Sequence, residues 1–107
     1  MKVGYTIKSV LTKYTNNPEG WFCLPKNHQD WTLETVGAFT RDSSDYPPDS
    51  DEYLPEEVRN GEWIVTIDNA TIEDIVLNLK EQKENPNTDE LLIAFVYYLE
   101  NDAFLIL

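Results

Sequence analysis

Apolar side chains recur at helical spacing in three stretches of the chain, residues 7–14, 70–83 and 89–100. Because an α-helix repeats about every 3.6 residues, positions three and four apart share one face and can enter a core together. Thr6 and Thr88 precede the first and third stretch and carry the side-chain oxygen of a typical N-cap. Three helices are therefore predicted. Their apolar faces consist of Ile7, Val10, Leu11 and Tyr14, of Ile72, Ile75, Val76 and Leu79, and of Leu91, Leu92, Phe95, Val96 and Leu99.

Short runs of β-branched, aromatic and other apolar residues, bounded by turn residues, predict four strands. They lie at residues 21–25, 32–40, 62–67 and 103–107. Gly37, inside the second run, indicates a bulge or a close backbone approach. The predicted order is α-β-β-loop-β-α-α-β. We expect a single α+β domain over residues 1–107, in which about three helices cover one face of a mainly antiparallel sheet of about four strands.

The loop in this order is a long acidic segment, "TRDSSDYPPDSDEYLPEEVR", at residues 40–59. Proline fixes φ and biases the preceding residue toward extended backbone, so the segment is stiff and is not expected to form a regular helix or strand. A loop of this length in a small domain is usually functional or disordered. Its acidic residues are Asp42, Asp45, Asp49, Asp51, Glu52, Glu56 and Glu57.

Two tyrosines, Tyr46 and Tyr53, lie among these acids and suggest a partner-binding surface. Tyrosine combines a large apolar ring with a polar tip and is common at interface hot spots, while the carboxylates can pair with several Lys or Arg side chains. The alternative is a solvated loop whose tyrosines pack on the core. Arg41 and Arg59 at its ends would favour that alternative if they tie the loop down through internal ion pairs.

The net charge of −12 narrows the class of partner. Such a field repels nucleic acid and anionic membranes, since both are bound through Lys and Arg. It accelerates encounters with a basic protein, although negative charge can also serve solubility alone. No apolar run has the length of a signal peptide or a membrane span, so we expect a cytoplasmic protein.

Residue types that carry catalysis are scarce. The single cysteine, Cys23, has apolar neighbours and is expected to be a buried hydrophobe, and the single histidine, His28, lies in a polar turn. An EF-hand begun at Asp49 lacks the required glycine and the final glutamate. We therefore expect neither a cofactor nor a metal and no enzymatic activity, with an enzyme based on carboxylates as a minor alternative.

Several stretches resemble a known family: "LPK" and "DW" within residues 24–31, the acidic loop, "TIEDIVLNLKEQK" at 71–83 and "AFVYYLENDAF" at 94–104. They are similar to small acidic bacterial immunity proteins of contact-dependent growth inhibition. The resemblance implies a cytoplasmic antidote that binds the toxic C-terminal domain of a delivered toxin with 1:1 stoichiometry. Many such toxins are basic nucleases.

Sequence and resemblance together favour a non-enzymatic immunity protein that neutralises a basic nuclease toxin. The predicted partner-binding residues are Asp42, Asp45, Tyr46, Asp49, Asp51, Glu52, Tyr53, Glu56 and Glu57. The alternative is an acidic mimic of nucleic acid that inhibits a DNA-binding enzyme.

Overall fold

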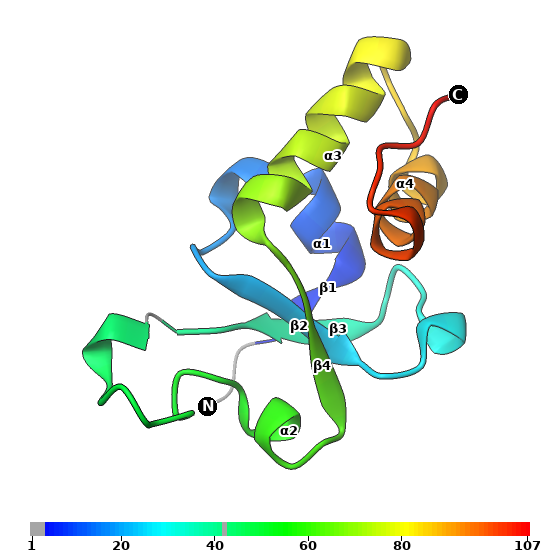
Figure 1. Cartoon of the computed structure of the whole chain (residues 1–107). Helices are drawn as coiled ribbons and strands as arrows, with labels where there is room; N and C mark the ends of the chain where they lie inside the picture. The colour runs from blue at the N-terminus through cyan, green and yellow to red at the C-terminus, as the bar shows by residue number, and fades with distance from the viewer. Residues whose placement is uncertain (1–3, 42) are drawn as a thin grey trace.

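Three helices lie on one face of a four-stranded antiparallel sheet in the computed structural model of the chain, which describes residues 4–41 and 43–107 (Figure 1). The strands are β1 (Tyr5–Thr6), β2 (Trp21–Pro25), β3 (Val36–Phe39) and β4 (Trp63–Asp68), in the spatial order β1-β3-β2-β4. The helices are α1 (Ile7–Thr12), α2 (Glu56–Arg59), α3 (Asn69–Gln82) and α4 (Thr88–Asn101). Short 3-10 turns occur at η1 (Tyr14–Asn16), η2 (His28–Asp30) and η3 (Ser43–Asp45). The α+β class is confirmed.

The core forms between the sheet and helices α1, α3 and α4, and it contains the predicted apolar faces. Each fully buried Leu, Ile, Val or Phe side chain contributes about 1.5–3 kcal/mol through removal from water. In α4, Ala94 joins the buried positions, whereas Leu92, Val96 and Leu99 are partly buried and pack against the core. The buried residues of the three helices are Ile7, Val10, Leu11, Ile72, Ile75, Val76, Leu79, Leu91, Ala94 and Phe95.

Gly37 confirms the predicted close backbone approach. It lies opposite Tyr5 in β1, and a Cβ at this position would collide with the carbonyl oxygen of Cys23 and with the side chains of Phe22 and Leu24. The β2–β3 register is regular, with Phe22 opposite Phe39. Gly37 therefore serves close strand packing, and there is no bulge at this position.

The predicted strand at residues 103–107 is wrong, because this segment lies beside α3 and α4 (Figure 1). Asp102 ends α4 with a left-handed φ of 52°, which turns the chain back. The Gln82 side chain then donates to the carbonyl of Leu105 and accepts from the N–H of Leu107, both at 2.8 Å. A side chain thus provides the hydrogen bonds that a neighbouring strand would have provided. The fourth strand is β1, so the order begins β1-α1.

Two further boundaries differ from the predicted ones. Residues 32–35 form a turn, since Thr32 N–H donates to Thr35 Oγ1 at 2.8 Å and Thr35 N–H donates to Thr32 O at 3.0 Å, so β3 is shorter than predicted. The acidic segment includes the single helical turn α2, although regular helix was not expected there. Pro55 immediately precedes α2. Proline is tolerated at the start of a helix, because the first backbone N–H groups there have no carbonyl acceptor within the helix.

Candidate interaction surface

The acidic segment, residues 40–59, lies on the side of the sheet opposite to α1, α3 and α4 (Figure 1). Successive turns order its backbone. Ser50 N–H donates to Pro47 O at 2.9 Å, Leu54 N–H donates to Asp51 O at 3.0 Å, and Glu52 N–H donates to Ser50 Oγ at 3.1 Å. The stiffness predicted from the prolines is thus reinforced by local hydrogen bonds.

Arg41 fastens the segment at two points. Its backbone N–H donates to Tyr53 O at 2.7 Å, and its guanidinium Nη1 donates to the Tyr46 hydroxyl at 3.1 Å. The bond to Tyr46 raises the pKa of Arg41. Arg41 therefore ties the loop down through a tyrosine hydroxyl and a backbone carbonyl. These two bonds are not the internal ion pairs that would have favoured the solvated-loop alternative. Both tyrosines are half-buried.

Most of the predicted acidic residues point into solvent. Asp45, Asp49, Asp51, Glu52 and Glu56 are exposed, and Glu57 is half-buried. Asp42 lies outside the described residues. Exposed carboxylates of this kind are available to a cationic partner without a large desolvation cost.

Three hollows meet at Thr40 and Tyr53, with volumes of about 620, 660 and 260 Å³. The first lies between the Glu19–Trp21 stretch and Pro47 and Pro48 of the acidic segment. The second extends toward α2 and β1. The smallest is mainly apolar and is lined by Trp21, Thr40, Tyr53, Leu54 and Val65. The structure thus brings predicted Tyr53 together with residues of β2 and β4, whereas Tyr46 does not line these hollows.

Hydrogen bonds between Trp21 and Thr40 hold the base of these hollows. Trp21 N–H donates to Thr40 Oγ1 at 3.0 Å, and Thr40 N–H donates to Trp21 O at 2.9 Å. Gly20 has a φ of 125°, and a Cβ there would come within 2.7 Å of Thr40 O. Glycine is required here both for the backbone conformation and for this close approach.

Trp21 and Val65 are interface candidates that the sequence did not single out. Phe22 and Leu24 enter the core, whereas Trp21 and Val65 lie on the other face of the sheet, where both line the smallest hollow. The register between β2 and β4 is irregular between Trp21 and Cys23. Trp21 is 48% exposed and Val65 is 38% exposed. The signal was present: "WFCLP" is apolar at every position, which leaves apolar side chains on whichever face the helices do not cover.

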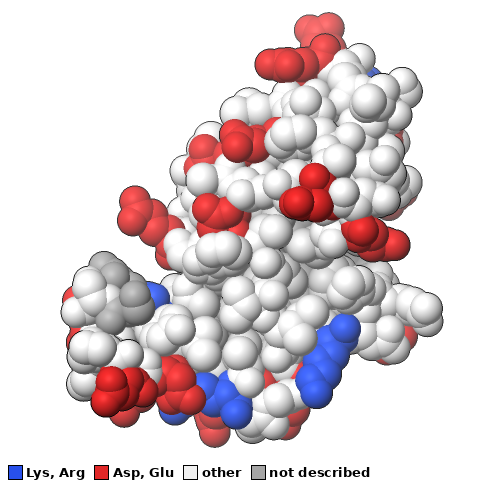
Figure 2. All heavy atoms as spheres, viewed as in Figure 1, with Lys and Arg blue, Asp and Glu red and all other residues white. Residues whose placement is uncertain are grey.

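Charge is distributed unevenly on the face drawn in Figure 2. Acidic side chains gather over the helical part, and acids together with Lys and Arg lie along the lower edge beneath the sheet. A band without charged side chains lies between them, over the sheet. A centre depleted of charged side chains, surrounded by a polar rim, is the usual anatomy of a protein interface.

In a comparison with protein families, the model for a domain of unknown function (DUF7716) matches residues 4–107. The chain belongs to the DUF7716 family. Comparison with curated proteins and with solved structures gave no match.

The single cysteine and the single histidine of this DUF7716 domain both contact neighbouring residues. Cys23 is buried, as predicted, and burial raises its pKa to about 11. His28 stacks on Trp31 with ring centroids 4.6 Å apart, and Trp31 Nε1 donates to Pro25 O at 2.8 Å. Within residues 4–41 and 43–107, no three His, Cys, Asp or Glu side chains gather as metal ligands would. Nor is any helix in that part of the chain long and apolar enough to cross a bilayer.

Proposed function

We propose that this protein binds and neutralises the toxic domain of a delivered bacterial toxin, a basic nuclease, as an immunity protein of contact-dependent growth inhibition. It acts in the cytoplasm by stoichiometric 1:1 binding and catalyses no reaction. The observation that carries the proposal is the anchored acidic segment, whose exposed Glu52 and Glu56 line the second hollow together with Tyr53.

Electrostatics support a basic partner. A nuclease domain must attract phosphate and therefore presents Lys and Arg around its active site. A protein with a net charge of −12 attracts such a surface over several ångströms, and this attraction raises the association rate at low salt. The second hollow is lined by three carboxylates, those of Glu19, Glu52 and Glu56, and by the guanidinium groups of Arg41 and Arg59, so its lining is net negative.

The order in the segment supports tight binding. A loop that is already held by Arg41 and by its own turns loses less conformational entropy when a partner clamps it. A standard interface covers about 800 Å² per partner, which the segment and the neighbouring ends of β2 and β4 could supply.

A protection assay tests the proposal. The C-terminal domain of a large secreted protein encoded directly upstream would be expressed with and without this chain. Rescue of growth, together with a stoichiometric complex on co-purification, is the expected result. Toxicity without rescue or complex would refute the proposal, and recovery of a DNA-binding enzyme in place of a toxin domain would favour the nucleic-acid mimic.

Matched charge variants then test which surface binds. Asp49→Asn, Asp51→Asn and Glu52→Gln together remove three exposed charges of the acidic segment. The control combines Glu81→Gln, Glu84→Gln and Glu100→Gln, which removes three exposed charges from the helical part. We expect the first set to slow association about tenfold and the control to have a smaller effect. Equal effects would show that only total charge matters.

A further inference from the structure

The apolar hollow between Trp21, Leu54 and Val65 has a composition unlike the rest of the acidic side of the molecule. None of its lining residues is charged. Thr40, the aliphatic hydroxyl in its wall, is already engaged with the Trp21 backbone. The hollow therefore favours an apolar group, because a polar group inserted there would exchange its hydrogen bonds to water for contacts with rings and methyl groups.

The negative charge of this protein limits which partner can insert an apolar side chain into the hollow. A second copy of this chain also carries −12, so two copies repel one another at this face. The adjoining hollow is lined by three exposed carboxylates, those of Glu19, Glu52 and Glu56, and by Arg41 and Arg59. Its lining is therefore net negative, and positive groups beside an inserted apolar side chain would meet carboxylates there. The complementary occupant is an apolar residue flanked by Lys or Arg.

We infer that the hollow formed by Trp21, Thr40, Tyr53, Leu54 and Val65 is the anchor site for a cationic protein segment that inserts one aliphatic side chain. The inference deepens the proposed function and rests on it for the nature of the partner. It adds that affinity is centred on Trp21 and Val65, outside the acidic segment, while the carboxylates supply orientation and association rate.

Short peptides can serve as probes, because the inference specifies their chemistry. A peptide Lys-Lys-Leu-Lys-Lys would be titrated against the full chain, with Lys-Lys-Gly-Lys-Lys and Glu-Glu-Leu-Glu-Glu as comparisons. Methyl resonances of Leu54 and Val65 and the indole resonance of Trp21 report binding by NMR. The leucine-centred basic peptide should bind about fivefold to tenfold more tightly than the glycine-centred one, since it buries most of one leucine side chain.

Substitutions in and outside the hollow test whether the hollow causes the preference for the leucine peptide. Trp21→Ala and Val65→Thr should abolish the difference between the leucine and glycine peptides. Val36→Thr is the matched control, because Val36 is also an exposed strand valine, 47% exposed, and does not line the hollow. It should retain the full difference. Thermal melts of each variant verify that it is folded.

Equal binding of the two basic peptides, or binding of neither, would overturn the inference, as would equal binding of the acidic leucine peptide. These results are independent of the toxin. Leucine selectivity in a chain that gives no protection would retain the hollow as a site and refute the proposed function. Full protection and unchanged complex affinity with folded Trp21→Ala would refute the hollow and retain the function.

Discussion

Arg41 donates a hydrogen bond from Nη1 to the hydroxyl of Tyr46 at 3.1 Å, across the first turn of the acidic segment. The same residue holds Tyr53 through its backbone N–H. The two tyrosines therefore have different roles. The Tyr46 hydroxyl makes a hydrogen bond within the acidic segment, whereas Tyr53 lines all three hollows.

Tyr46→Phe should loosen the acidic segment without unfolding the domain. The substitution removes the hydroxyl that accepts from Arg41 and retains the ring. Amide hydrogen exchange should become faster in residues 43–53 and remain slow in β2 and α3, since local opening depends on local contacts. Tyr97→Phe on α4 is the control and should leave the segment unchanged. Unaltered exchange in Tyr46→Phe would show that the bond does not order the loop.

Gly20→Ala should be strongly destabilising, by about 2–4 kcal/mol, because it combines backbone strain with a collision against Thr40. Gly61 provides a matched comparison. It also has a positive φ, 86°, but an added Cβ there meets nothing within 4 Å. Gly61→Ala should therefore cost only the conformational strain, about 1–2 kcal/mol. Urea denaturation measures the loss of unfolding free energy in both variants. Equal losses would contradict the close approach at Gly20.

Cys23 should react slowly with a disulfide reagent near neutral pH. Its thiol is buried with a pKa raised to about 11, so few molecules carry the reactive thiolate. The rate should rise steeply only in strong alkali and should become fast in denaturant. A raised folded pKa also means that stability is retained below the ordinary value of 9.0 and declines above it, as the unfolded thiol ionises first. Fast labelling of the native protein would contradict this.

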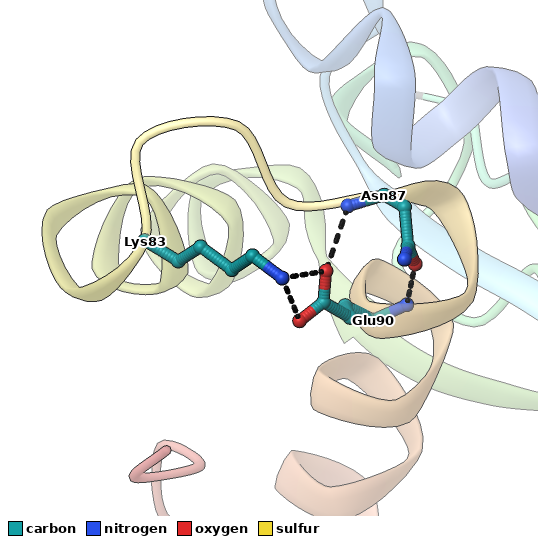
Figure 3. Close-up of polar contacts among 3 residues, drawn as sticks. All are labelled: Lys83, Asn87 and Glu90. Carbon is teal, nitrogen blue, oxygen red and sulfur yellow. Dashed lines mark hydrogen bonds and ion pairs between the residues drawn. The ribbon is translucent and has the colours of Figure 1, made fainter.

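The N-terminus of α4 carries a complete capping box, and its N-cap lies one residue before the predicted N-cap Thr88 (Figure 3). Asn87, rather than Thr88, is the N-cap, and its side chain accepts from Glu90 N–H at 2.8 Å. Glu90 Oε1 in turn accepts from Asn87 N–H at 3.0 Å and from Lys83 Nζ at 2.9 Å. The box thus joins the end of α3 to the start of α4.

Glu90→Gln should lower the melting temperature at neutral pH and have progressively less effect in acid. The hydrogen bond from Asn87 N–H, followed by that from Lys83, lowers the pKa of Glu90 below its ordinary value of 4.5. A lowered folded pKa stabilises the protein above the unfolded pKa, and the gain is lost as pH falls through the folded pKa. Thermal melts from about pH 7 to about pH 3 should show the melting temperatures of the wild type and Glu90→Gln converging. Glu84→Gln removes an exposed charge outside the box and should not converge in this way.

The strongest predictions from sequence concerned elements whose signal is local. Ile72, Ile75, Val76 and Leu79 predicted the buried face of α3, because helical hydrogen bonds connect residues four apart and the pattern repeats within the helix itself. Gly37 likewise indicated a bulge or a close backbone approach from its identity and position, and the close approach is the one that forms. The acidic segment was also recognisable from its run of acids and prolines, and most of its carboxylates are exposed in the structure.

Sequence alone determined the α+β class, the three core-covering helices and the acidic, tyrosine-bearing segment, because periodicity and charge are properties of neighbouring residues. Only the tertiary structure decided that residues 103–107 pair with Gln82, since strand pairing depends on which element lies alongside. It also decided that Trp21, Tyr53 and Val65 share one hollow. These residues are far apart in the chain, and only the pairing of β2 with β4 and the hold of Arg41 on the loop bring their side chains together.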